Sequence, residues 1–345
     1  MQALVKEKPE PGLTCQEIDE PRIERPDEVL YDVSTCAICT GEMKVYEWGE
    51  WAAADTTIQL PTVLGHEAAG VVREVGSEVT RVSPGDRVVV DPIIGCGHCE
   101  HCRAGFHNMC PDREIYSKRR GAMAEAAVLP ERAICRMPDG LSMAEGSLLE
   151  NLGIAVHAVE DFEHDPGNLA VVIGAGPIGI MAAQTLVAWG LKVLISDLIP
   201  YRIEIARKTS GAEVVDGDAA DLREVVIEES EGRGANFVLE AAATQTALDL
   251  ALDIVKPRGT VVTIGTFDGD VSFNPFFKMT RKEIRLQSRM GRSWETWRRM
   301  TQLVRDNRVN LGPLASATYP LTEFEKAFEH AKRTDTMKVL FEMGA

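Results

Sequence analysis

The chain has 345 residues, of which 45% are hydrophobic and 26% are charged. This composition is typical of a globular protein of about two domains and argues against disorder, collagen and coiled coil. The net charge of −16 disfavours nucleic acid and anionic membrane surfaces as partners. The N-terminal segment has no apolar stretch before a small-residue cleavage site, so we expect a cytoplasmic protein.

The first 90 or so residues contain short apolar or alternating runs separated by Gly and Pro, which predicts a mostly antiparallel β domain. Its expected strands are 3–5, 28–33, 68–75 and 86–90. From about 150 to 290, apolar strands alternate with helical segments, and this pattern favours a doubly wound parallel sheet. The expected strands there are 169–173, 192–196, 237–240 and 260–264, and the expected helices are 178–189 and 201–209.

The last fifty residues return to amphipathic helices, expected near 294–305 and 321–332. A final strand is expected at 338–342, where it would rejoin the first domain. The longest apolar run, from Ala170 to Ala183, is shorter than the roughly 18 residues that indicate a membrane span. We therefore predict a buried strand and turn at this place.

A Gly-x-Gly-x-x-Gly motif follows a predicted strand and opens a predicted helix. Its first glycine suits a tight turn, the second the close approach of a pyrophosphate, and the third the packing of helix on strand. The predicted cofactor-binding residues of this turn are Gly174, Gly176, Pro177, Ile178 and Gly179. A glycine-rich turn that binds another nucleotide, or none, is the alternative.

Asp197 ends the next predicted strand, 23 residues after Gly174. This matches the offset of about 20 residues expected for an acid that accepts hydrogen bonds from the adenosine ribose. Because a carboxylate there repels a 2′-phosphate, NAD is favoured over NADP. Arg202 is the nearby residue that would turn toward such a phosphate.

Four of the eight cysteines are separated by steps of 3, 3 and 8 residues. Thiolates at these steps wrap one tetrahedral zinc ion and leave no position for substrate, which predicts a structural zinc site. Its ligands are Cys96, Cys99, Cys102 and Cys110. An iron–sulfur cluster or a redox thiol pair is the alternative. Three histidines of this segment are expected to be bystanders: His98, His101 and His107.

A second candidate metal site is scattered along the chain, at Cys39, His66 and Glu150. Taken alone, each residue has an ordinary structural explanation. Together, a thiolate, an imidazole and a carboxylate form a three-ligand site with a fourth position open for water or an alcohol oxygen. Cys36 is the competing thiol, and we rank it lower because its surroundings resemble the end of a strand.

The order of these motifs resembles that of the zinc-dependent medium-chain alcohol dehydrogenases over essentially the whole length. Segments 44–52 and 291–300 are similar to segments of the branch that contains threonine and polyol dehydrogenases. The resemblance implies an α/β fold with a GroES-like β-barrel catalytic domain at 1–149 and 290–345, which carries the structural zinc lobe. It also implies a Rossmann NAD-binding domain at 150–289 and a homotetramer.

By matching position, the resemblance implies that Cys39, His66 and Glu150 hold a catalytic zinc ion. Glu67, next to His66, would be an exchangeable ligand or a close neighbour of the metal. Each chain would then bind two zinc ions, one catalytic and one structural, together with NAD.

The run after Cys39 departs from the family pattern. Thr40 directly follows the cysteine, and Lys44 stands where a histidine is usual. Thr40, Glu42 and Lys44 are therefore the candidate proton-relay residues. Further departures, at Asn151 and at 288–290, fall where substrate contacts are expected.

The activity implied by the resemblance is NAD-dependent oxidation of a secondary alcohol in a small hydroxylated molecule, such as a threonine-like compound, a polyol or a cyclitol. Zinc would lower the pKa of the alcohol, and the nicotinamide would accept the hydride. Four polar residues are expected near the substrate: Glu42, Lys44, Arg289 and Arg292. A carbonyl or sugar reductase with an altered proton relay, and a dinucleotide-binding protein without turnover, are the alternatives.

Overall fold

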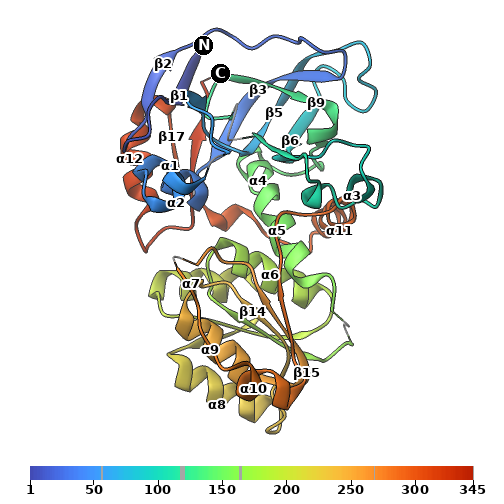
Figure 1. Ribbon diagram of the computed structural model, residues 1–345, viewed down its shortest axis with the longest axis vertical. Coiled ribbons are helices and arrows are strands. Elements are labelled where there is room, and N and C mark those ends of the chain that lie inside the picture. The colour runs from blue at the N-terminus through green and yellow to red at the C-terminus, as the bar shows by residue number, and fades with distance from the viewer. Residues whose placement is uncertain (56, 117–120, 163–164, 268, 345) are drawn as a thin grey trace. The chain divides into compact units, whose positions relative to one another are not determined.

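The computed structural model (Figure 1) describes residues 1–55, 57–116, 121–162, 165–267 and 269–344. The chain divides into two compact units, Met1–Glu150 with Leu314–Ala345, and Asn151–Pro313. Among the described residues, no helix is long and apolar enough to cross a membrane.

The first unit is built around the ten-residue strand β3 (Glu28–Ala37), which has neighbours along both edges. Strand β5 (Glu67–Val75) pairs with it antiparallel on one side. The other side is shared by β9 (Ala126–Pro130), opposite 28–32, and β18 (Lys338–Glu342), opposite 35–37. The prediction that the last strand rejoins the first domain is therefore confirmed.

The sheet continues in the order β10-β6-β5-β3-β18-β17, and a smaller sheet has the order β2-β1-β4. The remaining strands of these two sheets are β1 (Gln2–Lys6), β2 (Thr14–Glu17), β4 (Thr62–Val63), β6 (Arg87–Val90), β10 (Ile134–Arg136) and β17 (Ala315–Tyr319). The helices of the first unit are α1 (Thr40–Glu47), α2 (Glu50–Ala54), α3 (Glu100–Arg103), α4 (Met143–Ser147) and α12 (Phe324–Ala331). Two short strands, β7 (Ile93–Ile94) and β8 (Glu114–Ile115), flank the segment that contains Cys96, Cys99, Cys102 and Cys110.

The core of the first unit joins the two ends of the chain. Phe328 of α12 stacks on Tyr46 of α1, with ring centroids 4.3 Å apart, and also contacts Phe341 of β18. Phe328 and Phe341 are wholly buried. Burial of such aromatic side chains holds the C-terminal segment in place against the segment that carries Cys39.

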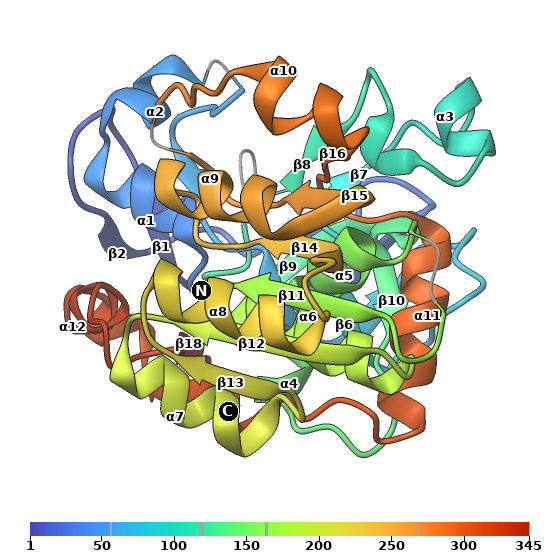
Figure 2. The ribbon, with the colours of Figure 1, turned by 90° about the horizontal axis from the view of Figure 1, so that it is seen from below.

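The second unit contains a six-stranded parallel sheet in the order β13-β12-β11-β14-β15-β16, which Figure 2 shows in sequence from β16 to β13. The strand order reverses direction at β11 and β14, which is the switch point of a doubly wound fold. The strands are β11 (Leu169–Ile173), β12 (Lys192–Asp197), β13 (Glu213–Asp216), β14 (Ala235–Glu240), β15 (Val255–Thr263) and β16 (Arg285–Ser288).

The central strand β11 is apolar and buried at all five positions, as expected for a parallel strand covered on both faces. Its bounds match the predicted ones, as do those of the helix at 294–305. The helices of this unit are α6 (Pro177–Ala188), α7 (Pro200–Thr209), α8 (Ala219–Glu229), α9 (Gln245–Ile254), α10 (Pro275–Lys278) and α11 (Trp294–Arg305), together with most of α5 (Leu149–Val159).

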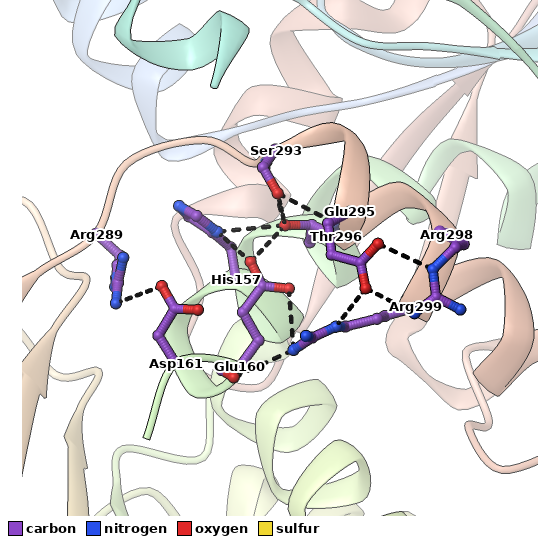
Figure 3. Close-up of polar contacts among 9 residues, drawn as sticks. All are labelled: His157, Glu160, Asp161, Arg289, Ser293, Glu295, Thr296, Arg298 and Arg299. Carbon is purple, nitrogen blue, oxygen red and sulfur yellow. Dashed lines mark hydrogen bonds and ion pairs between the residues drawn. The ribbon is translucent and has the colours of Figure 1, made fainter. Parts of the chain in front are cut away.

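The expected assignment of 290–313 to the catalytic domain stays a prediction, and by its contacts this segment falls within the second unit. The physical reason is that α11 is tied to α5 by buried hydrogen bonds. One of these runs from Thr296 Oγ1 to Glu160 Oε1 at 2.7 Å, between residues 136 positions apart (Figure 3).

Candidate zinc and dinucleotide sites

The four cysteines predicted to bind structural zinc lie together, with one sulfur from each within 4.8 Å of the others. Backbone amides point at these sulfurs: Cys99 N donates to Cys96 Sγ at 3.3 Å, and Cys96 N donates to Cys110 Sγ at 3.4 Å. The backbone amides of His98 and Cys99 lower the pKa of the Cys96 thiol to about 6. Four free thiols so arranged suit a closed tetrahedral zinc site.

The histidines of this lobe have other partners. His107 Nε2 lies 2.7 Å from Asp91 Oδ2 in a buried pair, and His98 Nδ1 lies 3.0 Å from the Cys96 carbonyl. The donor atoms grouped in the lobe are the four thiols. The ligand set predicted from the spacing is thus the one that the structure brings together.

The residues of the second candidate site also meet. One group contains Cys39, Glu42 and His66, the other contains His66, Glu67 and Glu150, and the donor atoms of each group lie within 4.8 Å of one another. Cys39 is the N-cap of α1, so it lies directly before the first turn of this helix.

Cys36, the competing thiol, lies inside β3 and is wholly buried. Its Sγ lies 3.8 Å from the Ala37 carbonyl. Of these two thiols, Cys39 is the one grouped with His66.

Glu42 is the outer partner of His66. One of its carboxylate oxygens contacts His66 Nδ1, and the other accepts a hydrogen bond from Cys39 N at 2.9 Å. Because Nδ1 is engaged, Nε2 is the nitrogen left for a metal ion, as is usual for carboxylate–histidine–zinc arrangements. Glu42 is buried, so it orients a ligand, a role that the sequence analysis did not assign to it.

Glu67 forms a buried ion pair with Lys338, in which Lys338 Nζ lies 2.6 Å from each carboxylate oxygen. The same ammonium group donates to the Ile38 carbonyl at 3.2 Å. Burial lowers the pKa of Lys338, but the charges of Glu67, Cys39 and Glu150 and the hydrogen bonds to Glu67 together outweigh burial, and the pKa lies above its usual value. Glu67 is thus held by a fixed cation.

The donor set fits zinc. Burial, followed by the negative charge of Glu67, raises the pKa of the Cys39 thiol, so ionisation of this thiol requires a nearby cation. A sulfur, an imidazole nitrogen and a carboxylate oxygen form a typical three-ligand set for catalytic zinc, and His66 is common to the group that contains Cys39 and the group that contains Glu150.

The other predicted site residues are more dispersed. Thr40 is the first residue of α1, and Lys44 lies one turn further on, with Nζ 5.7 Å from the Trp51 ring centroid. Arg289 Nη2 pairs with Asp161 Oδ2 at 2.7 Å. Arg292 is wholly buried, with its guanidinium 5.7 Å from the Trp297 ring centroid. Of the predicted substrate contacts, Glu42 and Arg292 are thus buried, whereas Lys44 and Arg289 are half-buried.

The glycine-rich turn connects β11 to α6. Gly174 has a φ of +105°, and a Cβ on Gly179 would lie 2.0 Å from the Gly174 carbonyl oxygen, so both positions require glycine. A Cβ on Gly176 would meet nothing within 4 Å. Gly176 is the N-cap of α6 and makes no side-chain cap, with Pro177 directly after it. The free amides and the open space suit a phosphate group.

Asp197 ends β12 and organises this turn. Its Oδ2 accepts a hydrogen bond from Ala175 N at 2.8 Å, and its Oδ1 accepts from Leu198 N and Ile199 N at 2.8 and 2.9 Å. Arg202 Nη1 lies 3.8 Å from Oδ2. The predicted acid therefore lies beside the glycine-rich turn, with its carboxylate fixed by three amides.

The chain is similar to known zinc-binding dehydrogenases. Residues 25–139 match the model of the alcohol dehydrogenase GroES-like domain, and residues 177–306 match that of the zinc-binding dehydrogenases. An L-threonine 3-dehydrogenase of Pyrococcus furiosus is 32% identical over 347 residues, which cover 99% of this chain and 98% of the relative. A probable D-xylulose reductase A of Emericella nidulans is 29% identical, with 93% of this chain and 90% of the relative covered.

Solved structures agree with the fold. Galactitol-1-phosphate dehydrogenase from Escherichia coli superimposes with a TM-score of 0.88 at 26% identity, covering 99% of this chain and 100% of that chain. Together with the two metal-ligand clusters and the parallel dinucleotide sheet, these similarities show that the chain belongs to the zinc-dependent medium-chain alcohol dehydrogenases, in the branch of the threonine and polyol dehydrogenases.

Proposed function

We propose that this protein oxidises a secondary alcohol of a small hydroxylated substrate to a ketone with NAD, and catalyses the reverse reaction. The observation that carries the proposal is the joining of thiol, imidazole and carboxylate donors around His66. The similar proteins are named for hydroxylated small molecules, namely threonine, xylulose and galactitol 1-phosphate. A threonine-like compound, a polyol or a cyclitol is therefore the substrate class that we propose.

In this proposal Cys39, His66 and Glu150 hold the catalytic zinc, which when bound polarises the alcohol oxygen and lowers its pKa. Glu42 orients His66 through Nδ1. Lys338 holds both oxygens of Glu67, which keeps one ligand position open for substrate. Thr40 and Lys44, on one face of α1, are the proposed route for the alcohol proton.

We propose NAD as the cofactor, bound at 174–179 and Asp197. The carboxylate of Asp197 is anchored by three backbone amides, so a 2′-phosphate would meet a fixed negative charge. Arg202 Nη1 lies 3.8 Å from this carboxylate, whose remaining lone pair would accept a hydrogen bond from a ribose hydroxyl. Titration with NADH and NADPH, followed by fluorescence, tests the preference.

We also propose that the protein is cytoplasmic and assembles as a homotetramer, as the similarity to this branch implies. Analytical ultracentrifugation measures the assembly state directly. We likewise propose that the catalytic domain comprises the first unit together with 290–313, as the similarity implies. By its contacts, this segment packs with the dinucleotide-binding unit.

The decisive experiment combines metal analysis with a substrate screen. Reduction of NAD is followed across amino acids, polyols and cyclitols, and Cys39→Ala is compared with Cys36→Ala, which removes the thiol lying in β3. We expect Cys39→Ala to bind one zinc ion per chain instead of two, to lose turnover and to retain NADH binding. Cys36→Ala is expected to keep both ions. Unchanged turnover in Cys39→Ala would contradict the proposal.

A further inference from the structure

Glu240, the last residue of β14, carries a wholly buried carboxyl group. Its Oε1 accepts hydrogen bonds from the backbone amides of Ala242 at 2.9 Å and Ala243 at 2.7 Å. Its Oε2 is buried and has no hydrogen-bond partner among the described residues. Burial raises the pKa of Glu240, and the backbone hydrogen bonds oppose this shift. The carboxyl group thus supports, from below, a turn at 241–243 that is itself exposed or half-buried.

The helix that follows this turn does not need Glu240 as its cap. Thr244 is the N-cap of α9, and its hydroxyl accepts a hydrogen bond from Ala247 N at 3.1 Å. The two amides bound by Glu240 precede this cap and belong to the turn. Ala243 has a φ of +56°, in the left-handed region that residues other than glycine rarely adopt. The hydrogen bonds of Glu240 therefore stabilise a backbone conformation that alanine disfavours.

The turn at 241–243 lies beside the glycine-rich turn. Its strand β14 is adjacent to β11 at the switch point of the sheet (Figure 2), where dinucleotides bind in doubly wound folds. Ala241 N donates to the carbonyl of Ile173, the last residue of β11, at 2.9 Å. A Cβ on Gly174 would lie 3.0–3.1 Å from atoms of Ala241 and Ala242. The backbone of 241–243 therefore borders the proposed dinucleotide site.

The strand order relates this turn to one half of the cofactor. The proposed NAD site has the adenosine ribose at Asp197, the end of β12, and the phosphates at Gly176, the N-cap of α6. β12 and β14 lie on opposite sides of β11. Since a doubly wound sheet is built from two halves that each bind one mononucleotide, the β14 side corresponds to the nicotinamide half.

We propose that Glu240 is a positioning residue for the nicotinamide half of the cofactor. By accepting the amides of Ala242 and Ala243, it holds the turn in the conformation in which its backbone borders this half of NAD. Glu240 acts through the turn and touches neither cofactor nor metal. All of these residues belong to the second unit, and the inference rests on the proposed function, from which NAD is taken as the cofactor.

Glu240→Met tests the inference because it removes both oxygens and keeps the length of the side chain. An apparent affinity falls with the fraction of molecules in the binding-competent conformation, and left-handed backbone is disfavoured for alanine by a factor of about 10. We therefore expect the dissociation constant of NADH, measured by fluorescence titration, to rise about 10-fold. ADP, which lacks the nicotinamide half, is expected to bind the parent and Glu240→Met equally well in calorimetric titrations.

Two further variants separate the geometry of the turn from a general loss of stability. Glu240→Gln keeps an accepting oxygen at the same side-chain length and is expected to bind NADH as the parent does. Glycine adopts left-handed backbone readily, so Ala243→Gly added to Glu240→Met is expected to recover NADH affinity without the carboxyl group. If Glu240→Met does not fold, Glu240→Asp, which withdraws the carboxylate by one methylene group, replaces it and is expected to weaken NADH binding.

Asp218→Ala is the matched control. Asp218 Oδ1 also accepts two backbone amides, from Ala220 at 2.7 Å and Asp221 at 3.3 Å, but it follows β13, the edge strand of the same sheet. This variant is expected to have a lower melting temperature and the parent's NADH affinity. Parent-like NADH affinity in Glu240→Met would overturn the inference. Equal losses in Asp218→Ala, equal losses for ADP and NADH, or no recovery by Ala243→Gly would overturn it as well.

Binding by the parent separates this inference from the proposed function. If the parent binds NADH and Glu240→Met binds it equally well, only the positioning role fails. If the parent does not bind NADH, the proposed cofactor fails, and the positioning role fails with it.

Discussion

Lys338 Nζ donates to both carboxylate oxygens of Glu67 at 2.6 Å, across 271 positions of the sequence. Both side chains are buried. Removing one partner of such a pair leaves an uncompensated buried charge, which costs far more than the pair itself contributes.

We expect Lys338→Met to lower the free energy of unfolding by about 3–5 kcal/mol, measured by urea denaturation of the zinc-loaded protein. The double variant Lys338→Met/Glu67→Gln is expected to recover part of this loss. Lys326→Met is the control because Lys326 pairs with Glu323 at 3.0 Å on the surface, and it should change stability by less than about 1 kcal/mol. Equal losses in the two lysine variants would contradict the buried-charge explanation.

Glu42→Ala is expected to weaken zinc binding at the catalytic site by about 10-fold to 100-fold, because His66 loses the carboxylate that fixes its ring. The change also removes a helix cap. Glu145→Ala is therefore the comparison, since Glu145 completes the capping box of α4 with Ser142. It should cost about 1 kcal/mol of stability and leave zinc affinity unchanged. Competition with a chromogenic chelator gives both affinities, and equal values for the parent and Glu42→Ala would exclude the orienting role.

Alanine substitutions at two glycines of the dinucleotide turn are expected to affect different properties, namely stability and cofactor affinity. Gly179→Ala places a methyl group 2.0 Å from the Gly174 carbonyl oxygen, so the melting temperature should fall along with cofactor affinity. Gly176→Ala meets no atom within 4 Å and should fold normally while binding NADH more weakly. Thermal denaturation and fluorescence titration distinguish the two outcomes. Normal NADH affinity in Gly176→Ala would show that the phosphate does not approach this position.

Lys6 makes the free energy of unfolding depend on pH. Its Nζ donates to the carbonyls of Gly12 and Tyr46 and is buried, and burial lowers its pKa from 10.5 to about 8. Between these values the unfolded chain binds a proton that the folded chain lacks, so stability from this group rises with pH. The difference in free energy of unfolding between parent and Lys6→Met should therefore shift in favour of the parent from pH 8 to 10. Parallel stability curves over this range would contradict the assignment.

Elements with local periodicity were predictable from the sequence. The strand at 169–173, the helix at 294–305 and the strand at 338–342 have the expected bounds, because their apolar patterns depend on neighbouring residues alone. The four-cysteine zinc site was equally predictable, since its four ligands lie within fifteen positions.

The residues that contact His66 and Glu67 were not predictable from local patterns. Glu42 was expected in a proton relay, and its contact with His66 spans 24 positions. The one local signal was the acid three residues after Cys39, which forms a capping box with a cysteine as the cap. Lys338 was expected only as part of a strand, because nothing near it in sequence indicates a buried acid. Long-range pairs of this kind depend on the strand order, which local patterns do not specify.

The position of β18 has a consequence for biosynthesis. β18 lies between β3 and β17 in the first unit's sheet and follows the whole second unit in sequence, so a nascent chain lacks this strand while the second unit is being synthesised. The dinucleotide-binding unit occupies the continuous stretch Asn151–Pro313 and has all its strands earlier, and domains generally fold as units during synthesis. The sheet of the first unit is thus completed only after the residues of the dinucleotide-binding unit have been synthesised.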